Sequence, residues 1–255
     1  MSFRGTCLCI GLAIGLMTNA AAFGAGMKPA AIDAAKPSGK SLPHDKPTPL
    51  GVRLQVLLDR AHFSPGEIDG KFGENARKAL QAYAESRQLP SSDALTDDVW
   101  TKLRENDRPA TTTYVITDKD IAGPYLRRLP SKLDDMKGIS KMSFTSPREQ
   151  LAERFHMSEG LLAALNPGQR FDRAGDTIAV VDTGGDMGGD MKGTSAKADR
   201  VEVDKSRQTV KLFDKSNALI GFYPATVGSE DKPSPTGTLK VTEINPNPIY
   251  RYNPK

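Results

Sequence analysis

Cysteine is scarce in this chain: the 255 residues include only two, Cys7 and Cys9. Both lie in a segment that we expect to be removed on export, so the mature protein is predicted to contain no thiol. This excludes a disulfide scaffold, a thiolate metal site and a cysteine nucleophile within these residues.

A long hydrophobic run and a block of like charge are also missing. The apolar stretch at residues 8–17 is shorter than the about 20 residues that a bilayer-spanning helix needs. The 35 basic and 31 acidic side chains give a net charge of +4, without a run of five like charges. A nucleic-acid partner is therefore not expected, because such proteins concentrate Lys and Arg on one face or in a tail.

Residues 1–25 have the features of a signal peptide. Arg4 precedes the apolar stretch, and the three alanines at 20–22 suit a signal-peptidase site. We predict export to the periplasm or cell wall and no stable membrane insertion after cleavage. A buried core helix and lipoprotein processing are the alternatives. Lipoprotein processing is disfavoured because Cys7 and Cys9 lie at the front of the apolar stretch.

Breaks in composition divide the remaining chain, and the predicted fold class is α+β with several domains. Residues 26–49 are rich in Ala, Lys, Pro and Ser without hydrophobic periodicity, which predicts a flexible tether. Residues 183–198, where Gly-Gly-Asp-Met occurs twice, are predicted to be a Gly-rich linker. A calcium loop at Asp186 and Asp190 is the alternative, but the acidic residue at every second position is missing.

Residues 50–105 are predicted to form three helices. Apolar side chains recur at helical spacing over residues 52–61 and 76–88, with a tight loop between them. Thr96 is a good N-cap for a short third helix. We expect these helices to form one compact unit.

The same helices and loop resemble the small peptidoglycan-binding domain of cell-wall hydrolases and transpeptidases. The loop Ile68-Asp69-Gly70-Lys71-Phe72-Gly73 and the helix end Ala79-Leu80-Gln81-Ala82-Tyr83 follow the family pattern. One departure is Ala84, which stands where the family usually has Gln after the aromatic residue. The resemblance implies peptidoglycan as the partner. We interpret Phe72 and both loop glycines as turn-forming residues.

Residues 111–182 predict a strand, two helices and a closing strand. The expected elements lie at residues 113–116, from Ser146 and Pro147 onward, at 158–165 and at 177–181. From Leu151 to Val181 the sequence resembles the lysin motif, a glycan-binding fold with this element order. Its Leu165-Asn166-Pro167 turn and Gly175-Asp176-Thr177-Ile178 strand entry match.

Two features depart from the lysin pattern. The Gly-Asp-Thr-Leu stretch after the first strand is absent, and residues 117–145 intervene as an insertion. The sequence therefore leaves two interpretations of this segment: a functional sugar-binding site and a degenerate spacer. Asn166 is interpreted as a residue that ends a helix.

From Asp199 onward apolar residues recur at every second position, which predicts a series of β-strands. Strands are expected over residues 201–203, 210–213 and 219–223, followed by a proline-rich turn that leads into another strand at 238–241. This order resembles the N-terminal part of an L,D-transpeptidase catalytic domain, a β-sandwich of cell-wall cross-linking enzymes. The matching motifs are Phe222-Tyr223-Pro224-Ala225-Thr226-Val227-Gly228 and Pro235-Thr236-Gly237-Thr238.

The resemblance implies acyl transfer through a cysteine nucleophile. Its thiolate attacks the peptide bond before the terminal D-residue of a tetrapeptide stem, and an amine of a neighbouring stem resolves the acyl-enzyme. The family's His-Gly-Thr and Ser-x-Gly-Cys-x-Arg motifs do not occur in these 255 residues. His44, His62 and His156 are interpreted as incidental or structural, since none precedes a glycine.

No catalytic, cofactor-binding or metal-binding residue is therefore assigned within this sequence. Zinc-protease, serine-hydrolase and phosphate-loop motifs are also missing. We expect a truncated L,D-transpeptidase whose nucleophile lies beyond Lys255. The alternative is a non-catalytic peptidoglycan-binding protein with a remnant catalytic domain. The sequence does not decide the oligomeric state.

Overall fold

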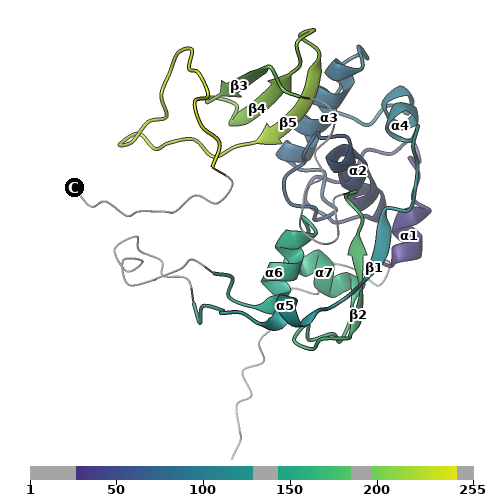
Figure 1. Ribbon diagram of the computed structural model, residues 1–255. Coiled ribbons are helices and arrows are strands. Elements are labelled where there is room, and N and C mark those ends of the chain that lie inside the picture. Colours follow the sequence, from purple (N-terminus) through teal and green to yellow (C-terminus); the bar gives the residue numbers. More distant parts are fainter. Residues whose placement is uncertain (1–26, 129–142, 185–196, 246–255) are drawn as a thin grey trace, which may run out of the picture.

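The computed structural model describes residues 27–128, 143–184 and 197–245, which form short helices and two small sheets (Figure 1). The predicted signal peptide, most of the Gly-rich linker with both candidate calcium ligands, and the last ten residues lie outside these ranges. No helix within the described ranges is long and apolar enough to cross a membrane.

Four helices occupy the first described segment: α1 (Pro29–Asp33), α2 (Pro49–Arg60), α3 (Glu74–Ser86) and α4 (Asp97–Leu103). The last three confirm the predicted three-helix unit. Thr48 caps α2 by accepting a hydrogen bond from the Gly51 backbone N–H at 3.0 Å, and Thr96 caps α4 as predicted.

The loop between α2 and α3 is held by the buried side chain of Gln55. Its amide oxygen accepts from the Gly70 backbone N–H at 2.7 Å, and its amide nitrogen donates to the Asp69 carboxylate at 3.0 Å. Gly51 packs so closely that a Cβ there would meet the Gly70 carbonyl oxygen at 2.0 Å. The contacts of Gly70, the burial of Phe72 and the position of Gly73 as the N-cap of α3 give all three residues structural roles.

The next segment has the predicted order of strand, two helices and strand, with one added helix. Its elements are β1 (Thr111–Val115), α5 (Asp118–Ile121), α6 (Pro147–Arg154), α7 (Glu159–Leu165) and β2 (Thr177–Val181). The two strands pair antiparallel, with Thr111 opposite Val181. Helix α5 lies in the predicted insertion, whose residues 129–142 are outside the described ranges.

Asn166 ends α7, as predicted, and also joins this helix to β2. Its amide nitrogen donates to the carbonyls of Leu162 and Ala179, and its amide oxygen accepts from the Ala179 backbone N–H at 2.7 Å. Because these bonds occupy a side chain that is already buried, Asn166 has no free group for a sugar.

A second sheet consists of β3 (Arg200–Asp204), β4 (Thr209–Phe213) and β5 (Leu219–Pro224), antiparallel and in sequence order. These are the three predicted strands. The strand predicted at residues 238–241 is wrong, since residues 225–245 contain no strand. Leu239 and Val241 are exposed, and no described strand lies beside this segment to supply the hydrogen bonds that a ladder needs.

Two hydrophobic cores organise these elements, and α2 contributes to both. Val52 and Val56 belong to a core with α1, α6, α7, β1 and β2. Leu54 and Leu58 belong to a second core, which includes side chains of α3 and α4 and Phe222 of β5. In Figure 1, α2 accordingly lies between the two groups of elements. Each core therefore contains side chains from more than one of the predicted segments.

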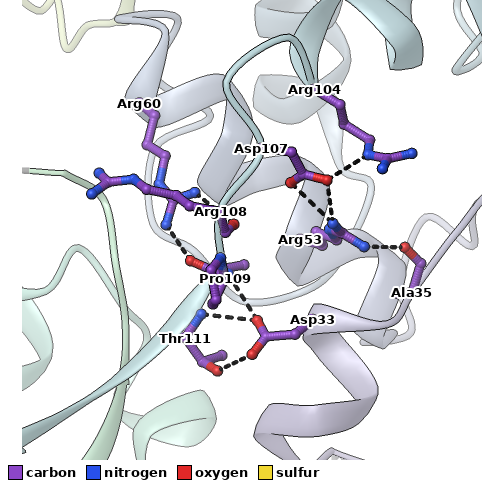
Figure 2. A network of polar contacts seen from close by, with 10 residues as sticks. Asp33, Ala35, Arg53, Arg60, Arg104, Asp107, Arg108, Pro109 and Thr111 are labelled. Atoms are coloured by element: carbon purple, nitrogen blue, oxygen red, sulfur yellow. Dashed lines mark hydrogen bonds and ion pairs between the residues drawn. The ribbon is translucent and has the colours of Figure 1, made fainter.

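The prediction of a flexible tether at residues 26–49 is wrong for the described residues 27–49. Helix α1 forms there, and Ile32 is fully buried in the first core. The Asp33 carboxylate accepts hydrogen bonds from the backbone N–H groups of Ala110 and Thr111, at 2.7 and 3.0 Å, and from the Thr111 hydroxyl (Figure 2). The sequence did not reveal this attachment, because the segment is anchored by one buried isoleucine and one carboxylate and not by a periodic apolar pattern.

Arg53 reinforces the same attachment from inside α2. Its guanidinium donates to the Ala35 carbonyl at 2.8 Å and forms an ion pair with Asp107 at 2.9 Å (Figure 2). It also lies 5.6 Å from the centre of the Trp100 ring. The residue is only 6% exposed, so its charge depends on these partners.

We predict that Asp33→Ala destabilises the whole chain by about 1–3 kcal/mol, because buried N–H groups of Ala110 and Thr111 lose their acceptor. Urea unfolding measures the change, and Asp45→Ala, at an exposed position in the same segment, is the control. Equal stability of the two variants would restore the tether interpretation.

Candidate functional site

The three histidines lie in different places, as their interpretation as structural or incidental residues requires. His44 is exposed, His62 follows α2 with φ of 66°, and His156 follows α6 with φ of 55°. The Nδ1 atom of His156 lies 3.0 Å from the Asp59 carboxylate. This hydrogen bond raises the pKa of His156, while partial burial opposes the rise.

The described part of the chain contains no cysteine and therefore no Cys–His pair. Cys7 and Cys9 lie outside it, so none of the three histidines has a thiol partner there. In the same ranges, no group of three His, Cys, Asp or Glu side chains is arranged to hold a metal ion.

The Pro235-Thr236-Gly237-Thr238 turn is joined to the β3–β4 turn by one lysine. The Lys205 ammonium donates to the Ser234 carbonyl at 3.1 Å and to the Thr236 hydroxyl at 2.5 Å. Asp204 stabilises the β3–β4 turn itself by accepting from the backbone N–H groups of Ser206 and Arg207. Hydrogen bonds from Arg207 and Ser206 lower the pKa of Asp204.

The loop before this turn folds back on itself around Gly228. The Ser234 hydroxyl accepts from the Gly228 backbone N–H at 2.8 Å. A Cβ at residue 228 would meet the Lys232 carbonyl oxygen at 2.2 Å, so only glycine fits without a shift of the backbone. Residues 228–236 are thus shaped by local bonds in the absence of a strand.

The inner face of the β3–β4–β5 sheet is attached to the three-helix unit through Phe222. Its side chain is buried in the second core, where Phe63 and Tyr83 also pack edge to face. Its backbone N–H donates to the His62 carbonyl at 2.9 Å, and its carbonyl accepts from the Ser64 backbone N–H at 2.8 Å. The loop after α2 therefore pairs directly with the edge of the sheet.

Charged contacts surround this attachment. The Lys211 ammonium lies 2.6 Å from the Glu85 carboxylate, and the Lys78 ammonium donates to the Arg207 carbonyl at 2.9 Å. Between α3 and the sheet they enclose a polar groove of about 270 Å³, whose lining includes Gln81, Ser91 and Thr209. The Lys211–Glu85 ion pair and the Lys78 hydrogen bond both join α3 to the sheet across this groove, so the groove belongs to the interface.

The other side of the sheet is open. Val201 and Val203 of the edge strand β3 are 50% and 55% exposed, and Tyr223 of β5 is also exposed. Apolar side chains on an unpaired edge are a feature that folded proteins normally cover.

Sequence reasoning missed Lys205, Glu85 and Lys211, which connect segments far apart in the chain. The only signal for Phe222 was its place in an alternating strand, which does not reveal the partner of the buried face.

The comparisons with known proteins agree with the predicted identity of the last segment. The YkuD family model, the L,D-transpeptidase catalytic domain, matches residues 198–255, which include the three-stranded sheet and the Pro235-Thr236-Gly237-Thr238 turn. Enzymes of this family are acyltransferases of peptidoglycan. No curated protein matches the chain. The peptidoglycan-binding and lysin-like resemblances stay predictions.

We predict that Phe222→Ala detaches the sheet from the helices, since truncating a buried phenylalanine costs about 3–5 kcal/mol. Backbone amides of β4 should then exchange hydrogen faster, as measured by mass spectrometry. Tyr223→Ala, at the exposed neighbour on the opposite face, is the control and should change exchange much less. Unchanged exchange in Phe222→Ala would contradict the attachment.

Proposed function

We propose that this chain is an exported L,D-transpeptidase-like protein of peptidoglycan cross-linking or remodelling, located in the periplasm or cell wall. Residues 27–182 bind the wall, and residues 198–255 are the beginning of the catalytic domain. The observation that carries the proposal is the family match over residues 198–255. The described part of these residues forms a three-stranded sheet whose edge strand is uncovered.

The proposed reaction is acyl transfer through a cysteine. The nucleophile and its histidine base belong to the family motifs that do not occur in these 255 residues, and the proposal places them beyond Lys255. The residues present have a supporting role: Lys205 holds the Pro235-Thr236-Gly237-Thr238 turn, and Phe222 fixes the sheet to the helices. In this proposal, the remaining strands of the catalytic domain pair with a sheet whose position is already fixed.

The attachment also supports wall targeting. A catalytic domain joined firmly to a unit that binds the polymer stays near its stem peptides, which raises their effective concentration. The three-helix unit with its Gln55-braced loop, and the strand–helix–helix–strand segment, match the element orders expected for peptidoglycan-binding and lysin-like modules. Wall binding rests on those resemblances.

We predict that the protein encoded by the complete reading frame releases the terminal D-residue from tetrapeptide stems and forms stem-to-stem cross-links. Chromatography of digested peptidoglycan measures both products. Alkylation of the cysteine should abolish them, because the thiolate is the nucleophile. A stop codon directly after Lys255, with no product from the chain, would instead support the non-catalytic wall-binding protein.

A further inference from the structure

A second hollow lies at the C-terminal ends of α2, α3 and α4, away from the groove beside the sheet. It measures about 410 Å³, within the range of about 300–1,000 Å³ typical of ligand pockets. Four basic side chains and one acidic side chain line it: Arg60, Arg87, Lys102, Arg108 and Glu105. The hollow is therefore strongly cationic in a chain whose overall charge is only mildly positive.

Helix C-termini favour basic residues on their own account, because the macrodipole is negative there. Arg60 has such a structural role: its guanidinium donates to the Pro109 carbonyl at 2.5 Å (Figure 2) and to the Asp182 carbonyl at 2.6 Å. Burial lowers the pKa of Arg60, and the Asp182 carboxylate opposes this. Arg60 therefore forms the rear wall of the hollow and is not free to bind a ligand.

Arg87 differs from Arg60 in having no carboxylate partner among the described residues. Its guanidinium lies 5.2 Å from the centre of the Tyr83 ring, which orients it without neutralising its charge. The side chain is exposed at the rim of the hollow. A guanidinium fixed by an aromatic face is preorganised to bind a carboxylate through two parallel hydrogen bonds.

Arg108 is the second cation with unused capacity. It shares the single carboxylate of Asp182 with Arg60, at 3.4 and 3.3 Å respectively, and its side chain is 51% exposed. Lys102 is paired with Glu105 at 2.7 Å. The uncompensated charge is thus concentrated at Arg87 and Arg108.

The floor of the hollow is apolar and is formed by Leu57, Ala61 and Leu103. The cationic rim and the apolar floor together fit a short peptide with free carboxylates and small methyl side chains. Peptidoglycan stem peptides have this chemistry, whereas the glycan strand, with its carboxyl groups amidated by the stems, offers no comparable anion.

We infer that this hollow binds the stem peptide of peptidoglycan, with Arg87 and Arg108 as carboxylate ligands. The inference rests on the proposed wall binding and specifies which component of the wall is recognised. It assigns recognition to the helix ends and leaves the loop at residues 68–73 with a structural role.

The test uses the whole chain with three probes: purified sacculi, a fluorescent L-Ala-D-Glu-diamino acid-D-Ala tetrapeptide, and glycan strands stripped of stems by an amidase. The lactyl carboxylates that the amidase frees are converted to methylamides, so that the glycan probe has no carboxylate. The wild type should sediment with sacculi and bind the tetrapeptide. Arg87→Glu should weaken tetrapeptide binding about tenfold or more, because a charge-assisted pair becomes a repulsion. Arg87→Gln should fall between them.

Arg77→Glu is the matched control, since it makes the same charge change in α3, the helix that Arg87 caps, and lies outside the hollow. It should bind as the wild type does. Urea unfolding of each variant separates lost binding from lost folding. Added salt should weaken wild-type binding, as expected for a solvent-exposed ion pair.

Three results would overturn the inference. The first is equal sacculus binding by the wild type and Arg87→Glu. The second is competition by stem-free glycan without competition by the tetrapeptide. The third is a weakening of tetrapeptide binding by Arg77→Glu that equals the weakening by Arg87→Glu. In each of these cases wall binding by the wild type, and hence the proposed function, would still stand. Failure of the wild type to sediment with sacculi would instead contradict wall binding itself.

Discussion

Helix α2 has apolar side chains on two faces, and each face is buried in a different core. Val52 and Val56 pack with α1, α7 and β2, while Leu54 and Leu58 pack with α3 and α4. The loop that follows α2 continues this arrangement: Ser64 pairs with Phe222 of β5, and Ile68 exchanges backbone hydrogen bonds with His156 and Ser158. One helix and one loop thus connect all three parts of the described chain.

Local signals in the sequence predicted most of the elements. Thr96 and Ser146 cap helices that begin where they were expected, because a cap depends on the backbone of the next few residues. The three strands after Asp199 follow from alternation alone. In these cases the information that determines the structure lies within the element itself.

Predictions failed where the structure depends on distant residues. The tether was wrong because Asp33 is held by backbone groups of residues 110 and 111, which no local pattern reveals. Residues 238–241 have a strand-like sequence, but among the described residues no neighbouring strand pairs with them. The candidate site shows the same limit. Arg87 and Arg108 line one hollow only because three helix ends pack together, and no local pattern in the sequence predicts that packing.

These observations connect stability with function. The family match covers only the last segment, but that segment is attached by Phe222 and Lys211 to the unit that carries the cationic hollow. Because α2 contributes to both cores, the helix ends proposed to bind the wall and the segment matched by the family model belong to elements that pack on one another.

The most direct test of this account is native-state hydrogen exchange in increasing denaturant, followed separately for amides of α3 and of β2. Because both cores include α2, the two sets should open together, with unfolding free energies that agree within about 1 kcal/mol. Opening of β2 at a clearly lower free energy, while α3 stays protected, would show that the segments are independent modules and would contradict the shared-core account.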